Sequence, residues 1–141
     1  MKQLCTMLLL ALSCRVACGT TVDFSQYIHL TPTNAAEYGI KFFYHAPIPA
    51  LVTVEMPYTK GERTFDEAVL EFGSSKQHFK IPVQGQKHEG DRLFVAFWMD
   101  RRTLRESTLK IRFSKKADIV PIVYVFSLKE FVPKHEKPPD K

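Results

Sequence analysis

Histidine is the residue of this sequence best suited to bind a metal ion, and the chain has five. His29, His45 and His78 fall on the polar side of segments that alternate between polar and apolar residues. Three imidazoles from neighbouring strands could surround Zn²⁺ or Cu²⁺. No two histidines stand at the close spacing that is typical of metal ligands, and single outward histidines are commonly just solvent-facing. We therefore predict no metal or other cofactor, and keep these three residues as the candidates for a copper or zinc site.

Residues that could act as catalytic nucleophiles or acids lack the arrangement that catalysis needs. The segment 73–76, Gly-Ser-Ser-Lys, is better explained as a hairpin loop than as a strained nucleophile turn. Asp66, Glu67 and Asp91 lie near the ends of expected strands, where acidic residues are commonly solvated, and no spacing singles out a carboxylate pair. The sequence therefore favours a protein that is not an enzyme, with a glycan-active hydrolase as an alternative.

A dense group of basic residues lies between positions 101 and 116, within a chain of formal net charge +5. Such a patch can bind an acidic protein, an anionic glycan or lipid headgroups, or it can be a solvated strand face that discourages aggregation. Nucleic-acid binding would need aromatic residues on the same face, whereas Phe97 and Phe113 fall on the apolar phase, so we predict no nucleic-acid partner. The basic residues expected to bind a partner are Arg101, Arg102, Arg105, Lys110 and Arg112.

Two aromatic residues fall on the outward phase of successive alternating segments. Tyr27 stands beside His29, and Phe43 stands beside His45. If these two strands pair, the four side chains form one amphipathic patch suited to a protein partner or a sugar ring. Tyr27 and Phe43 are therefore expected binding residues.

Short segments with a period of two dominate the chain and predict β-strands. About seven or eight such segments, joined by Gly, Pro and Ser turns, favour an antiparallel β-sandwich, immunoglobulin-like only in the broad sense of two packed sheets. A small β-barrel is the alternative. Helical turns are expected only at Thr33–Tyr38 and Asp100–Glu106. A hairpin is expected around Gly73–Ser75, with Phe79 and Ile81 pointing inward on its second strand.

Two segments, Leu93–Met99 and Ile119–Phe131, are apolar on both phases of the alternation. Strands that are buried on both faces have this pattern, so we expect Trp98 in the core. We also expect Ile119–Phe131 to be the sheet edge to which a partner strand is added, with Pro121 limiting where pairing begins.

The first nineteen residues have the features of a cleavable export signal. A cationic start at Lys2 precedes a largely apolar stretch, and Ala17 and Gly19 supply small residues around Cys18. Neither Cys14 nor Cys18 matches a lipoprotein signal well, so we favour simple cleavage over lipid anchoring. The expected organisation is a signal at 1–19, one domain at 20–132 and a disordered, charged tail at 133–141.

Together these features predict an exported protein, periplasmic, secreted or on the cell surface, without a transmembrane segment. We expect it to bind another protein as an accessory or assembly subunit. The alternative is a carbohydrate-binding module in which Tyr27, Phe43 or Tyr58 stacks on a sugar ring.

Overall fold

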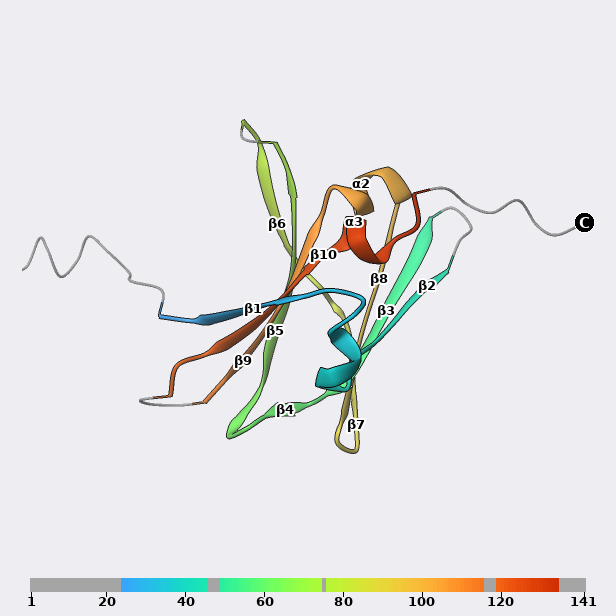
Figure 1. Cartoon of the computed structure of the whole chain (residues 1–141). Helices are drawn as coiled ribbons and strands as arrows, with labels where there is room; N and C mark the ends of the chain where they lie inside the picture. Colours follow the sequence, from blue (N-terminus) through green and yellow to red (C-terminus); the bar gives the residue numbers. More distant parts are fainter. Residues whose placement is uncertain (1–23, 46–48, 75, 116–118, 135–141) are drawn as a thin grey trace, which may run out of the picture.

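The computed structural model describes residues 24–45, 49–74, 76–115 and 119–134. The expected export signal at 1–19, with Cys14 and Cys18, lies outside the described residues, and so does the expected tail from residue 135 onward. The described residues form two β-sheets, which we call sheet A and sheet B (Figure 1). None of their helices is long and apolar enough to cross a membrane.

Sheet A has six strands and sheet B has four within the described part of the chain. In spatial order, sheet A contains β1 (Gln26–Leu30), β10 (Ile122–Ser127), β9 (Thr108–Ser114), β5 (Arg63–Gly73) and β4 (Thr59–Lys60), and β6 (His78–Pro82) pairs with the far end of β5. Sheet B contains β2 (Lys41–His45), β3 (Ala50–Pro57), β8 (Arg92–Met99) and β7 (Gly85–Glu89). Two short helices, η1 (Ala35–Tyr38) and α2 (Arg101–Arg105), connect strands of the two sheets, and a third, α3 (Leu128–Phe131), follows β10.

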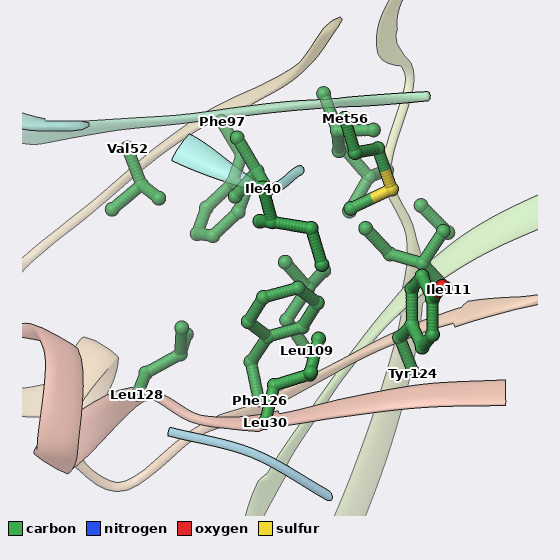
Figure 2. Packing of buried hydrophobic residues seen from close by; sticks show 14 of the residues in the cluster. Leu30, Ile40, Val52, Met56, Phe97, Leu109, Ile111, Tyr124, Phe126 and Leu128 are labelled. Atoms are coloured by element: carbon green, nitrogen blue, oxygen red, sulfur yellow. The ribbon is translucent and has the colours of Figure 1, made fainter. Parts of the chain in front are cut away.

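The core lies between the two sheets and comes from one phase of each alternating strand (Figure 2). In β3, Val52, Val54 and Met56 are fully buried, and the residues between them are only half-buried. Ile111 and Phe126 of sheet A are equally buried on the other side of the core. Each such side chain contributes about 1.5–3 kcal/mol when it leaves water. The expected β-sandwich is confirmed, and its stability comes from this shared apolar layer.

One strand pair departs from the antiparallel rule, because β1 pairs with β10 in parallel, from Gln26 opposite Ile122 to Leu30 opposite Phe126. The backbone N–H of Gln26 also donates to the carbonyl of Pro121 at 2.8 Å. β10 therefore has a neighbour on each side, β1 and β9, and its residues 122–126 are buried on both faces. The expectation that Ile119–Phe131 forms a free edge is wrong, and its last four residues are the helix α3.

The second apolar segment, β8, is buried on one face only. Leu93 and Val95 point into the core, whereas the other phase faces outward and leaves Trp98 63% exposed. Phe43, on the same outer face of sheet B, is 42% exposed. The expectation that Trp98 belongs to the core is therefore wrong, and the outward phase of β8 becomes a surface of interest.

The expected hairpin is present, with β5 and β6 paired from Val69 opposite Pro82 to Gly73 opposite His78. Figure 1 shows this hairpin extending beyond the two-sheet body. Phe79 and Ile81, expected inward, are therefore 48% and 46% exposed. They lie on the core side of sheet A, but sheet B does not reach them.

Two strands and one helix were not expected. β4 and β7 lie in polar segments for which we expected no strand, and α3 follows β10 directly. All five residues of β7 are exposed, so this edge strand carries no apolar alternation that could reveal it. Both expected helical turns are present as η1 and α2. In α2 the carboxylate of Asp100 caps the helix, accepting a hydrogen bond from the backbone N–H of Thr103 at 3.1 Å.

Candidate functional site

The residues expected to bind a partner lie in three separate places. Arg101, Arg102 and Arg105 belong to α2, and Lys110 and Arg112 lie on the outward side of β9 in sheet A, near Tyr27 of β1. Phe43 lies on the outward side of β2 in sheet B. Because β1 and β2 belong to different sheets, Tyr27 and Phe43 do not form the single patch that their sequence positions suggested.

The arginines of α2 contact the end of the described chain. Arg101 donates to the backbone carbonyl of Pro133 at 3.1 Å, and Arg105 donates to the carbonyl of Val132. The first residue of the expected disordered tail is thus held by a side chain of the domain. These two arginines connect α2 to the segment that follows α3. Their guanidinium groups therefore already form hydrogen bonds within the chain.

Tyr27, Lys110 and Arg112 are brought together on the outer face of sheet A. They line a hollow of about 350 Å³, which we call the charged hollow. Its apolar floor includes Val123, which is only 2% exposed beneath the longer side chains. The charged hollow is lined by Tyr27, Glu67, Val69, Glu71, Lys80, Pro82, Lys110, Arg112 and Val123.

Glu71 is the centre of charge in this hollow. Its side chain is 12% exposed, and its carboxylate oxygens lie 2.9 Å from Lys110 Nζ, 3.4 Å from Lys80 Nζ and 3.8 Å from His78 Nε2. Burial alone would raise the pKa of this carboxyl, but the hydrogen bonds and positive charges of Lys110 and Lys80 outweigh it and hold the pKa below its ordinary value. Glu71 is therefore ionised at neutral pH and neutralises part of the basic group.

A second acid–base pair extends the same network. Arg112 Nε lies 3.7 Å from a carboxylate oxygen of Glu67, and Lys110 Nζ lies 5.8 Å from the ring centre of Tyr27. Three cationic and two carboxylate side chains line the hollow, which leaves it weakly positive. The expected basic patch is present here, but most of its charge is matched by acids on β5.

The candidate histidines do not converge. His29 lies on β1, His45 on β2 and His78 on β6, and β1 and β2 belong to different sheets. Among the described residues, no group of three or more histidine, cysteine or acidic side chains could hold a metal ion. His29, His45 and His78, all within the described part of the chain, therefore do not meet around a single copper or zinc ion.

The outer face of sheet B carries a surface that the sequence did not reveal. We call it the aromatic face. In the strand register Leu51 lies opposite Trp98, and Thr53 lies between Phe43 and Ala96. Trp98 is 63% exposed and Phe43 is 42% exposed. The aromatic face consists of Phe43, Leu51, Phe94, Ala96 and Trp98.

One end of the aromatic face is bounded by charged residues. Arg92 Nη2 lies 3.1 Å from Oε1 of Glu55, and Lys41 Nζ lies 3.7 Å from the same oxygen. Arg92 also donates to the carbonyl of Gly39 at 3.0 Å. The face therefore combines an exposed aromatic area with an ordered charged rim.

A shallow hollow of about 440 Å³ extends this face over β7 and β8, beside Phe94 and Ala96. Gly85 lies at its edge, where a Cβ atom would stand 2.2 Å from the carbonyl oxygen of Ala96. Only glycine permits this close approach of β7 to β8. A side chain here would force β7 and β8 to shift relative to each other.

Tyr58, a candidate for sugar stacking, is already engaged. Its ring stacks on His88 with the ring centres 3.5 Å apart, and Phe65 lies on another side at 6.3 Å. One face of the Tyr58 ring is therefore covered.

No protein-family model matches this chain, and no curated protein and no solved structure matches it either.

Proposed function

We propose that this chain is a protein-binding module, exported as its N-terminal sequence suggests, and that the aromatic face contacts its partner. The observation that carries the proposal is the 63% exposure of Trp98, the single tryptophan of the sequence, with Phe43 on the same sheet face. Tryptophan is enriched among the residues that dominate binding energy at protein interfaces. Leaving such a side chain in water has no structural benefit.

The surroundings of Trp98 support a protein partner. Protein interfaces commonly combine an apolar centre with a polar rim. Phe43, Leu51 and Phe94 supply the centre, and the rim contains the charge cluster of Arg92 and Glu55. The charged hollow is the weaker candidate, because Glu71 and Glu67 already neutralise most of its cations.

Cross-linking of the native protein in the exported fraction of its cells, read by mass spectrometry, tests this proposal first. Lys41 and Lys87 lie beside the aromatic face, whereas Lys80 and Lys110 lie at the charged hollow. A dominant partner cross-linked through Lys41 or Lys87 supports the proposal. Cross-links confined to Lys80 and Lys110 contradict the choice of face.

With the partner in hand, its affinity for variants gives the second test. Trp98→Ala is expected to weaken binding by about thirtyfold or more, as for other interface tryptophans. Tyr27→Ala is the matched control, because it removes an exposed aromatic residue from the opposite face. Equal affinities for the wild type and Trp98→Ala would disprove the proposal.

Exposed Trp98 also favours a second candidate, a carbohydrate-binding module, because flat aromatic rings with an apolar face can stack on sugars. The single tryptophan makes this simple to test, since fluorescence comes from the site itself. A change in Trp98 emission with one polysaccharide of a broad panel, and no protein cross-link, would replace the first candidate by the second.

A further inference from the structure

The strand β6 has an open edge. It pairs with β5 on one side, and no described strand pairs with its other side. The backbone N–H of Val83 donates to the carbonyl of Ala68, and the N–H of Ser74 donates to the carbonyl of Gln77, each at 2.8 Å. Backbone N–H and C=O groups alternate in direction along a strand. Those of Phe79 and Ile81 therefore point toward β5, as those of Gln77 and Val83 do. The residues between them, His78 and Lys80, direct their N–H and C=O groups to the open side.

Proline at position 82 fits this arrangement. Pro82 lies two residues after Lys80, so its backbone points to the open side, as the backbone groups of His78 and Lys80 do. The N–H group that proline lacks is therefore not one that would bond to β5. The hairpin therefore loses no internal hydrogen bond to this residue. The open edge still offers the N–H groups of His78 and Lys80, which suffice to pair a short added strand.

The two sides of β6 differ in chemistry. On the core side of sheet A, Phe79 and Ile81 are about half exposed, and Phe79 stacks on Phe72 with the ring centres 5.4 Å apart. On the outer side lie His78 and Lys80, and the carboxylate of Glu71 on β5 stands 3.8 Å from His78 Nε2 and 3.4 Å from Lys80 Nζ. A strand that pairs here would place alternate side chains over an apolar surface and beside the side chains of His78 and Lys80, which are 55% and 66% exposed.

Charge also distinguishes the occupants of this edge. Two copies of β6 paired antiparallel about their centres would place Lys80 directly against Lys80, and like charges in that position are destabilising. An acidic strand would instead meet the weakly positive side that Lys80 shares with Lys110 and Arg112. The positive side therefore favours an acidic chain at this edge.

We propose that β6 binds an extended segment of a partner protein as an additional strand of sheet A. The bound segment alternates apolar side chains over Phe79 and Ile81 with acidic side chains beside His78 and Lys80. This site lies on a different sheet from the aromatic face and does not depend on it.

A labelled peptide, Glu-Val-Glu-Val-Glu-Val-Glu, tests the proposal by fluorescence anisotropy with the full chain. We expect it to bind at least tenfold more tightly than the neutral peptide Thr-Val-Thr-Val-Thr-Val-Thr. Absence of binding at about 1 mM, where even weak complexes of this kind are populated, would overturn the proposal. So would equal affinity for the two peptides.

Variants of Lys80 separate the backbone contribution from the charge contribution. Lys80→Pro removes an N–H from the open edge without removing a hydrogen bond to β5, and we expect at least a tenfold loss of peptide affinity. Lys80→Thr keeps the N–H and removes the charge, so we expect a loss for the acidic peptide that is smaller than that of Lys80→Pro. If Lys80→Pro binds as the wild type does, no strand is added at β6.

Two further variants complete the experiment. Ile81→Thr keeps the β-branched shape and the backbone, and we expect severalfold weaker binding of both peptides because the apolar contact is lost. It also tests the site if Lys80→Pro fails to fold, and an unchanged affinity would contradict the proposed position of the peptide. Trp98→Ala is expected to leave peptide binding unchanged, so failure of the aromatic face and failure of the β6 edge can be told apart.

Discussion

The outer faces of the two sheets differ in how far their apolar residues are covered. Both sheets carry apolar residues on the side that faces away from the core. On sheet A, Val123 and Val125 are covered by long side chains, above all Lys110 and Arg112, whose heads are paired with acids of β5. On sheet B, the residues around Trp98 are short or only half-buried, and nothing in the described chain covers the indole.

This difference shows what long charged residues do on a sheet. The methylene groups of lysine and arginine can lie over apolar residues while their charged ends remain in water. That arrangement is stable on sheet A because Glu67 and Glu71 stand within reach of the charges. On sheet B the acid–base pairs stand at one end, around Glu55, and the aromatic residues stay open. We therefore regard sheet A's outer face as largely closed and sheet B's as available.

The strongest test of this contrast is a serine substitution on each of the two faces. Val123→Ser on sheet A is expected to reduce the free energy of unfolding by about 2–3 kcal/mol, because it leaves a cavity and buries a hydroxyl. Ala96→Ser at the half-buried centre of the aromatic face should cost less than about 0.5 kcal/mol. Urea unfolding of both variants measures the difference. Similar costs for the two would mean that the faces are equally covered.

Removing one lysine from each face gives a smaller expected difference. Lys110→Met breaks the 2.9 Å contact with Glu71, whose side chain is only 12% exposed, and we expect a loss of about 1–2 kcal/mol. Lys41→Met removes a 3.7 Å contact with Glu55 from a lysine side chain that is 65% exposed, so we expect less than about 0.5 kcal/mol. If Lys41→Met lowers the free energy of unfolding more than Lys110→Met does, the ion pairs of the charged hollow do not stabilise the fold more than those around Glu55 do.

The pH dependence of stability follows from Glu71. Its pKa in the folded chain lies below the ordinary value of 4.5, so its ionised form stabilises the fold above pH 4.5. That contribution is lost as the pH falls below 4.5 through the folded pKa. We expect Glu71→Gln to be less stable than the wild type at pH 7, with the difference narrowing in acid. Melting temperatures from pH 7 to pH 3 test this, and a gap that widens in acid would reverse the sign.

The smallest expected change in stability comes from Trp98 itself. Trp98→Gln should alter the free energy of unfolding by less than about 1 kcal/mol, because the indole is 63% exposed. The native emission of Trp98 should be that of a hydrated indole and shift little on unfolding. A blue-shifted native spectrum together with a loss above about 3 kcal/mol would place Trp98 in the core after all.

Much of this fold could be predicted from local pattern. The buried phases of β2, β3 and β9, the hairpin of β5 and β6 and the helical turn of α2 are all encoded within a few residues of sequence. Each depends on neighbours along the chain. Alternation and capping residues therefore sufficed to place them.

What could not be predicted depends on which strands meet. The apolar segments β8 and β10 look alike in sequence, but β10 is flanked by β1 and β9 and buried on both faces, whereas β8 is covered on one face only. The pairing of β1 with β10 joins opposite ends of the domain and leaves no local signal. For the same reason the sequence revealed neither the aromatic face nor the separation of Tyr27 from Phe43.

The pairing of β1 with β10 also sets the order in which the chain can fold. β1 cannot pair until β10 has been synthesised. Contacts between distant parts of a chain also form slowly, because a long loop must close. Until β1 arrives, the apolar strand β10 has an unpaired edge, which is the kind of surface that aggregates. We therefore expect β1 to pair late in folding, and a chain cut short before Ile122 would lack the strand with which β1 pairs. Sheet A can therefore be finished only after β10 has been synthesised.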